Sequence, residues 1–337
     1  MENSMLYFVH CMSPVHIGAG QGTGLIDMPM LREKTTEWPY MPGSSIKGVH
    51  RRYFESGKSK ISEEWVEEKV KEWVNHAFGQ EEKNNEKQKE TVEKSGSVAV
   101  DKGNSENAKS SQATAGALVM SDARLLAFPV ASLHGTFAYV TCPLAIQRMQ
   151  RDVLAIGSDM PKLVWDHLLD KLTDNVIVTD ANSKIADHNM LVTIDEFNSK
   201  AEPDESFREW AEWLAEQAFL KKDPISQTML TKRLVLVADE VFQYFVTICS
   251  EVVTRIGIDR NTGTVKDGAL WTEEYLPVES LLYGVVWKDY FSRSAKGIAS
   301  DQVLEPFLKD QIYLQIGGNA TVGKGRIRCS YAGGETE

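Results

Sequence analysis

One carboxylate, Asp27, stands among apolar residues in the segment GLIDMPM, directly after the glycine-rich turn HIGAGQGTG. A carboxylate in that setting can hold a divalent metal ion or orient an attacking hydroxyl during phosphodiester cleavage. An aspartate with an ordinary pKa of ~3.9 is a weak base at neutral pH, so metal binding or positioning suits it better than proton abstraction. An Asx turn or a cap is the structural alternative. His16 lies close in sequence and is a second candidate for the same site, although a lone histidine is more often structural.

A second segment, GGNATVGKG (317–325), has the spacing of a P-loop at Gly318, Gly323 and Lys324. Nucleotide binding is nevertheless disfavoured, because Gly325 replaces the Ser or Thr that holds Mg²⁺ and no strand–crossover–helix unit follows. A glycine-rich loop between two strands lets its N–H groups approach a phosphodiester closely, and Lys324 and Arg326 add positive charge. A simple tight hairpin is the alternative.

The third segment, PGSSIKGVHRRYF, predicts a helix that begins with Ser44 or Ser45 as its N-cap. Lys47 and Arg51 lie one turn apart on that helix, away from its apolar face. A helix N-terminus with hydroxyls and cations favours an anion, while a solvated helix face is the alternative. Two segments suited to anions together indicate contact with an RNA or DNA backbone.

The composition excludes several classes of protein. Lys and Arg number 37 against 48 Asp and Glu, a net charge of −11, which argues weakly against nonspecific nucleic-acid binding but allows a local basic stripe. The four cysteines are far apart and form no CxxC pair, so a zinc site or a disulfide framework is not expected. No apolar run reaches the ~18–20 residues of a membrane helix, and the start lacks a signal-peptide pattern. We therefore expect a cytoplasmic protein with no membrane partner.

The residues named above must be positioned by helices and strands, and the order of the expected elements predicts an α+β fold with a mainly antiparallel sheet. Met5–Met12 is expected to be a buried strand, and the chain lacks the repeated crossovers of a doubly wound fold. The polar residues 80–112 have almost nothing to bury and predict a disordered insertion. Turn residues around Gly263 predict a long β-hairpin, in which Trp271 and the tip residue Val265 are suited to wedge between bases or to pack in a core.

Five segments, taken in chain order, carry a resemblance: HIGAGQGTGLIDMPMLRE, PYMPGSSIKGVHRRYF, GALVMSDARLLAFPV, TGTVKDGALWTEEYLP and GGNATVGKGRIR. Together they resemble the RAMP proteins (repeat-associated mysterious proteins) of CRISPR systems, in particular the repeated Cas-seven-type backbone subunit of the type III-B, or Cmr, effector complex. The resemblance spans residues 5–328 and is interrupted by the polar insertion. It implies one RAMP-type domain over residues 1–337, with a modified RRM-like or ferredoxin-like core, helical insertions and a thumb hairpin over residues 254–288.

The resemblance also implies a function. Copies of such a subunit stack as a filament along guide RNA, and an aspartate in the loop after the first strand cuts the paired target RNA at regular intervals with a divalent metal, for which Mg²⁺ is the expected ion. Asp27 matches that aspartate and would also be the metal ligand. The implied partners are guide RNA, target RNA, further copies of the chain and the other Cmr subunits (small, large polymerase-like and other RAMP subunits). A RAMP subunit that binds guide RNA without cutting is the alternative. The expected RNA contacts are His16, Ser44, Ser45, Lys47, Arg51, Gly317, Gly318, Asn319, Gly323, Lys324, Gly325 and Arg326.

Overall fold

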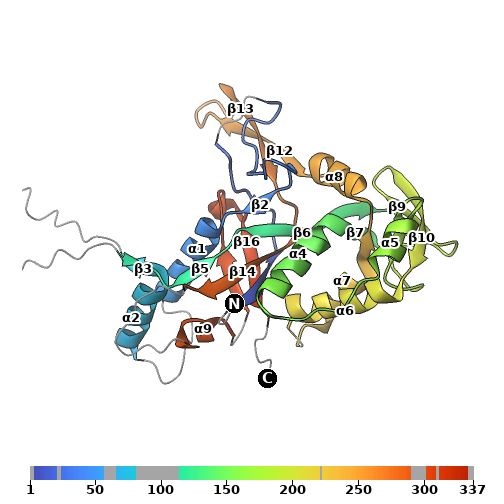
Figure 1. The fold of residues 1–337 in the computed structure, drawn as a ribbon. Helices are drawn as coiled ribbons and strands as arrows, with labels where there is room; N and C mark the ends of the chain where they lie inside the picture. Colours follow the sequence, from blue (N-terminus) through green and yellow to red (C-terminus); the bar gives the residue numbers. More distant parts are fainter. Residues whose placement is uncertain are drawn as a thin grey trace, which may run out of the picture.

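Helices and strands alternate along the chain in a computed structural model that describes residues 4–20, 24–56, 66–80, 114–220, 222–289, 301–308 and 311–332 (Figure 1). The predicted α+β class is confirmed. The helices are α1 (Gly43–Glu55), α2 (Glu67–Phe78), α4 (Pro143–Ala155), α5 (Trp165–Leu172), α6 (Glu205–Ala218), α7 (Pro224–Arg233), α8 (Asp239–Ile248) and α9 (Glu305–Leu308). The strands are β1 (Ser4–Cys11), β2 (Tyr40–Met41), β3 (Gly79–Gln80), β4 (Thr114–Ala115), β5 (Leu118–Met120), β6 (Ala123–Ser132), β7 (Thr136–Thr141), β8 (Asn175–Val178), β9 (Leu191–Ile194), β10 (Phe197–Pro203), β11 (Leu234–Leu236), β12 (Glu251–Ile258), β13 (Val265–Tyr275), β14 (Leu281–Lys288), β15 (Ile312–Gln315) and β16 (Arg326–Tyr331).

Among the described residues, twelve strands join in one sheet with the order β15-β16-β1-β14-β6-β7-β11-β8-β10-β9, to which β2 and β5 attach. The predicted mainly antiparallel sheet is confirmed, since only the pairs β7–β11 and β8–β10 in this part of the chain are parallel. The apolar run at the start of the chain is β1, which is almost wholly buried between β14 and β16.

Strand β6 belongs to both halves of the sheet. Its first residues pair with β14, and its last residues pair with β7 and, at Ser132, with β9. Because β9 lies at the end of the run β7-β11-β8-β10-β9, this last pairing closes six strands into a barrel-like unit. Helices α4, α7 and α8 contact this unit.

The other half of the sheet, β15-β16-β1-β14-β6, stays open, and helices cover both of its faces. On one face, His50 of α1 contacts the Tyr331 hydroxyl of β16, and on the other the Ser330 hydroxyl donates to the Ala218 carbonyl of α6 at 2.7 Å. Neighbouring residues of a strand point to opposite faces, so α1 and α6 pack on opposite sides of β16. None of the described helices is both long and apolar enough to cross a bilayer.

Helix α1 begins at Gly43, two residues earlier than an N-cap at Ser44 predicts. Its N-cap is Pro42, and the first free N–H, that of Gly43, donates to the Asp122 carboxylate at 2.8 Å. The assignment of Ser44 or Ser45 as N-cap is therefore wrong, because a carboxylate 79 positions away fills that role. Arg124, two residues after Asp122, forms an ion pair with Asp152 at 3.0 Å.

The predicted disordered insertion falls, apart from Gln80, outside the described residues. Gln80 itself lies in β3, which pairs with β4 so that Gly79 faces Ala115 and Gln80 faces Thr114. Strands β3 and β4 thus lie side by side.

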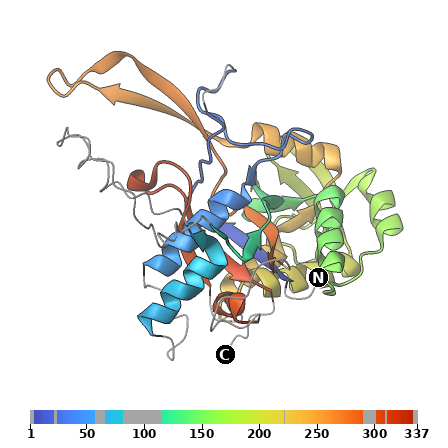
Figure 2. The same ribbon diagram turned by 60° about the vertical axis from the view of Figure 1, so that its left-hand side comes forward.

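Strands β12 and β13 form a two-stranded hairpin apart from the main sheet, and Figures 1 and 2 show it projecting from the body of the molecule. The hairpin runs over residues 251–275, not 254–288. Strand β14, which the prediction placed in the hairpin, lies in the main sheet between β1 and β6. The turn residues near Gly263 were located correctly.

His50 predicts a measurable dependence of stability on pH. The ring is fully buried, and burial lowers the pKa of His50 from 6.5 to about 4, so the folded protein holds it neutral. Between these two values the unfolded chain binds a proton that the folded chain does not, so the free energy of unfolding falls as the pH drops, by roughly 3 kcal/mol in total for this group. In His50→Gln, denaturant titrations at pH 7 and pH 4.5 should show a smaller loss than in the wild type. Equal losses in the two proteins would contradict the assignment.

Candidate active site

Asp27 lies at the surface beside the base of the hairpin. The main-chain N–H and the hydroxyl of Thr272 on β13 donate to Asp27 Oδ2 at 2.8 and 2.9 Å, and the Asp27 N–H donates to the Thr272 hydroxyl at 3.0 Å. These bonds, led by that from the Thr272 main chain, hold the pKa of Asp27 below its usual value. Asp27 is therefore a positioned carboxylate at neutral pH, and not a group that readily takes up a proton.

On the other face of β13, Glu273 is a buried carboxylate with four donors. Burial raises its pKa, but the hydrogen bonds from Tyr275, Trp271 and Arg255 outweigh burial and keep the pKa of Glu273 below its usual value. One of the four donors is the side-chain amide of Asn319 in the glycine-rich loop, so Glu273 links that loop to the hairpin. The donors are Trp271 Nε1 at 2.8 Å, Arg255 Nε at 3.1 Å, Asn319 Nδ2 at 3.0 Å and the Tyr275 hydroxyl.

The glycine-rich loop joins β15 to β16 as a β-hairpin with a single 3-10 turn. A strand follows it directly, which excludes the P-loop arrangement. Gly317 has a φ of +75°, and a Cβ there would lie 2.2 Å from the His16 carbonyl oxygen, so the position requires glycine. The Gly318 N–H donates to the same carbonyl at 2.9 Å. The loop is thus built directly on the main chain of His16.

The His16 side chain supports the site from below. It is buried, its Nδ1 lies 2.7 Å from the Glu274 carbonyl oxygen, and its ring centroid lies 5.6 Å from that of Tyr275. The expected direct RNA contact of His16 is therefore corrected to a supporting role, because the imidazole is not presented at the surface. This agrees with the structural alternative.

The remaining loop residues divide into two groups. Lys324 is half-buried and interacts within the chain: its Nζ lies 3.2 Å from Glu251 Oε1 and 4.6 Å from the centroid of the Tyr275 ring. Gly325 is buried with a φ of +79°, and it shapes the loop from inside. The Arg326 side chain and Gly323 are exposed, so they present a cation and an accessible main chain to solvent.

The predicted basic face of α1 is present but partly neutralised. Lys47 Nζ donates to the Leu118 carbonyl at 2.6 Å, and burial, followed by the nearby Arg51 charge, lowers the pKa of Lys47. Arg51 pairs with Glu55 at 2.8 Å. Both cations border an open hollow of about 580 Å³, and exposed Ser44 lies at its rim. Asp122 already takes the first N–H of α1, so the anion site depends on the side chains more than on the helix terminus.

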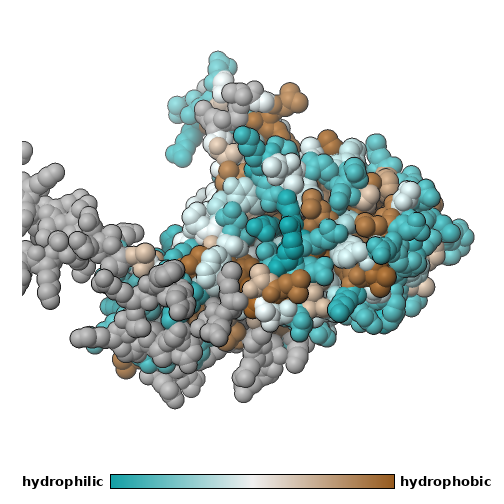
Figure 3. All heavy atoms as spheres, in the orientation of Figure 1, coloured by the Kyte–Doolittle hydropathy of each residue, from teal (hydrophilic) through white to brown (hydrophobic). Residues whose placement is uncertain are grey.

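The outer part of the hairpin exposes apolar side chains, among them Ile256, Val265 and Leu270. Figure 3 shows brown side chains at the top of the molecule, where the hairpin and the Asp27 segment project. Ile256 pairs with Leu270, and Thr254 pairs with Thr272, so these residues share the face that binds Asp27. Trp271 lies on the opposite face and donates to Glu273, so it is fixed at the hairpin base and does not form the tip.

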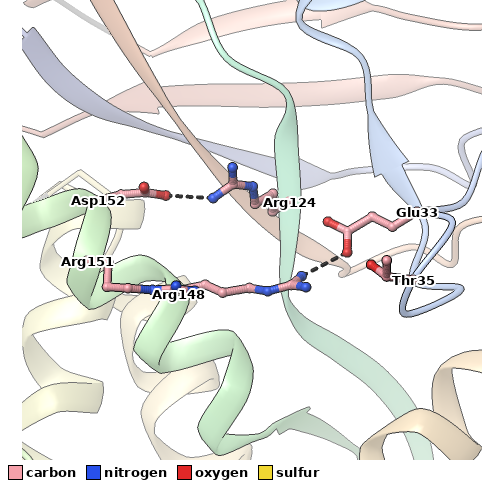
Figure 4. A pocket seen from close by; sticks show the side chains of 6 residues that line it. All are labelled: Glu33, Thr35, Arg124, Arg148, Arg151 and Asp152. Carbon is pink, nitrogen blue, oxygen red and sulfur yellow. Dashed lines mark hydrogen bonds and ion pairs between the residues drawn. The ribbon is translucent and has the colours of Figure 1, made fainter.

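A second open hollow, of about 520 Å³, lies between the segment after Arg32, strand β6 and helix α4 (Figure 4). Its cations are mostly paired: Arg124 with Asp152 at 3.0 Å, and Arg148 with Glu33 at 2.8 Å. The sequence patterns did not point to this hollow. They also missed Thr272 and Glu273, for which the acidic pair in WTEEYLP was the available signal.

The side chains near Asp27 do not build a metal centre by themselves. Among the described residues, no group of three or more His, Cys, Asp or Glu side chains is placed to hold an ion. Glu273 and Glu274 are occupied by Arg255 and Arg32. A single carboxylate does fit the way in which Mg²⁺ binds through one or two carboxylates, with substrate phosphates and water completing its shell.

Comparisons with known proteins give the family and the fold of the chain. The model of the RAMP superfamily matches residues 8–328. The CRISPR system Cmr endoribonuclease Cmr4 of Pyrococcus furiosus is 31% identical over 323 residues, which cover 96% of this chain and 93% of that protein.

Two solved structures have a similar fold. Oligomeric Cmr4 from Pyrococcus furiosus superposes with a TM-score of 0.66 at 26% identity, covering 98% of each chain. A chain of the type III-B Cmr-beta complex bound to cognate target RNA gives a TM-score of 0.66 at 17% identity, covering 97% of this chain and 96% of that chain. The second likeness extends to the fold alone.

Proposed function

This chain belongs to the RAMP superfamily, and from that premise we propose that it is the repeated, RNA-cleaving backbone subunit of a type III-B CRISPR effector complex. It binds guide RNA as a filament of its own copies and cuts guide-paired target RNA at regular intervals. The observation that carries this function is the exposed Asp27 carboxylate, fixed by Thr272 where the hairpin meets the body. The non-cutting alternative is weaker, because the 31% identical relative is named an endoribonuclease.

The proposed chemistry is an in-line attack within the target strand. The Asp27 carboxylate accepts a hydrogen bond from a target 2′-hydroxyl and aligns its oxygen with the adjacent phosphorus. The bond from the 2′-oxygen to phosphorus forms as the bond to the 5′-oxygen breaks, with one proton lost to solvent and one gained from it. The products are a 2′,3′-cyclic phosphate and a 5′-hydroxyl.

A divalent ion, for which Mg²⁺ is the candidate, is part of the proposal. When bound at Asp27 it would offset the charge of the phosphodiester. What supports it is the exposed carboxylate with its low pKa; the rest of its ligands would come from RNA and water.

The surfaces for partners follow from the charges described above. Ser44, Lys47 and Arg51 at one hollow, with Gly323 and Arg326 of the glycine-rich loop, are proposed to hold the guide backbone. The projecting hairpin is proposed to be the thumb, with the open half of the sheet as the RRM-like core. A filament of copies is supported by the solved Cmr4 from Pyrococcus furiosus, which is oligomeric.

Purification of the tagged chain with the subunits encoded beside it tests the assignment as a whole. We expect the chain to co-purify with them and with short RNAs that match CRISPR spacers. A chain that carries no RNA and no partner subunits would contradict the proposal.

Lys47→Gln should weaken binding of guide RNA several-fold at low salt. The change removes one charge at the hollow, and it avoids placing a carboxylate against the Leu118 carbonyl, as glutamate would do. Each lost phosphate contact flattens the plot of log affinity against log salt by about one unit. Lys200→Gln, at an exposed lysine of β10, is the matched control. An unchanged affinity and slope for Lys47→Gln would remove Lys47 from the guide site.

A further inference from the structure

The segment that carries Asp27 is held to the hairpin by a largely buried ion pair. Arg32 NH2 lies 2.5 Å from Glu274 Oε1, and the Met30 N–H donates to Glu274 Oε2 at 3.0 Å. The Ser250 hydroxyl donates to Oε1 at 2.8 Å. Glu274 is only 3% exposed, so the carboxylate is fully committed to these partners.

Glu274 and Thr272 are two residues apart on β13, so both side chains point to the face on which Asp27 lies. The segment therefore meets β13 at two successive positions, with Asp27 against Thr272 and Met30 against Glu274. Main-chain bonds between them complete the contact, since the Met28 N–H donates to the Thr272 carbonyl and the Glu274 N–H donates to that of Met28, both at 3.0 Å.

Asp27 cannot hold this arrangement by itself. Its own contacts are exposed to water, where single hydrogen bonds contribute little net stability. The neighbouring Leu25 and Met28 side chains are also exposed, so they supply no apolar anchor. The largely buried Arg32–Glu274 ion pair adds a charged attachment to these main-chain bonds, and removal of Arg32 is costly because the Glu274 charge is left buried.

The residue after Arg32, Glu33, forms a second ion pair on the other side of the segment. Glu33 pairs with Arg148 of α4 at 2.8 Å, across the hollow shown in Figure 4. Consecutive residues thus bind the hairpin on one side and helix α4 on the other. The segment cannot tilt toward either without breaking an ion pair.

We propose that Glu274 and Arg32 are positioning residues for RNA cleavage, which hold the Asp27 carboxylate in register with the scissile phosphodiester. This rests on the proposed function. Neither residue touches the reacting atoms, so their loss should lower the rate of the chemical step and leave target binding intact.

The test is single-turnover cleavage of labelled target RNA by the complex assembled with guide RNA, at saturating enzyme. Glu274→Gln is nearly isosteric, but its amide nitrogen cannot accept, so either the Arg32 or the Met30 contact is lost. We expect the rate constant to fall about 10- to 100-fold, the scale set by a misplacement of ~1 Å, with the target Kd within about twofold of the wild type. Arg32→Lys, which keeps the charge, should retain more activity than Arg32→Ala.

Two further variants grade the effect. Glu33→Gln breaks the more distant attachment and should lower the rate less than Glu274→Gln. Asp152→Asn breaks the Arg124–Asp152 pair, which joins β6 to α4 in the same hollow, and should cleave at the wild-type rate. Hydrogen exchange gives a readout independent of activity: the Met30 amide should exchange faster in Glu274→Gln, while the β1 amides stay protected.

The outcomes separate the two proposals. If the wild type cleaves, Asp27→Asn does not, and Glu274→Gln cleaves at the wild-type rate, the positioning role is wrong and the proposed function stands. If the wild-type complex does not cleave, or Asp27→Asn cleaves normally, the proposed function itself fails. A loss of target binding in Glu274→Gln equal to its loss of rate would also overturn the positioning role.

Discussion

Asp27→Asn should abolish cleavage of guide-paired target RNA and leave target binding within about twofold of the wild type. Asparagine keeps the size of the side chain and one oxygen that can accept from Thr272, so the segment should stay in place. It removes the negative charge that orients the 2′-hydroxyl. Loss of a contact of this kind typically costs ~10²–10⁴ in rate while ground-state binding is unchanged.

The measurement is single-turnover cleavage by the assembled complex with labelled target RNA. Asp187→Asn is the matched control, because Asp187 is a partly exposed aspartate whose pKa is also lowered by main-chain hydrogen bonds, here led by that from Leu191, but it lies in the barrel-like half. A chelator added to the wild-type assay should stop cutting, as the proposed Mg²⁺ requires. Cutting by Asp27→Asn at a comparable rate would refute the assignment.

A target with a single 2′-deoxy nucleotide at one cleavage position should remain uncut there and be cut normally at the others. The proposed attack uses the 2′-oxygen as nucleophile, so its removal deletes the reacting atom and not merely a contact. Base pairing with the guide does not use the 2′-hydroxyl for recognition, so the affinity should change little. We expect the loss of cutting at that position to exceed the loss in any single protein variant.

Mapping the ends of labelled fragments on a denaturing gel measures this directly. The unmodified positions of the same strand act as internal controls. A cut at the deoxy position would rule out the 2′-hydroxyl mechanism, and 5′-phosphate ends would point to attack by water instead.

The sequence located the candidate residues whose placement depends on local spacing. Asp27 lies in the loop after β1, and the glycine-rich loop joins two strands, as the patterns predicted, because turns and glycine requirements are encoded in adjacent residues. The partners of these residues could not be derived in the same way. Asp27 meets Thr272 at a separation of 245 positions, and no period in either segment encodes that contact.

The errors have the same origin. Strand character extends through residues 251–288, but periodicity does not say which strand pairs with which, so β14 was placed in the hairpin and not in the sheet. Ser44 and Ser45 have the residue type of an N-cap, but Asp122 on a distant segment fills that role. His16 was expected to contact RNA, but its ring is buried against the base of the hairpin, beneath the glycine-rich loop.

The burial of β1 between β14 and β16 has a consequence for synthesis on the ribosome. Strand β1 is made first and is apolar along nearly its whole length, yet both strands that pair with it in the described part of the chain, β14 and β16, are made near the end. At ~5–20 residues per second, β1 waits on the order of 15–50 s for Leu281–Lys288 to be made. During that time both of its edges are open to other chains, the condition that favours aggregation. The nascent chain should therefore depend on a chaperone, or on slow release, more than its folded stability suggests.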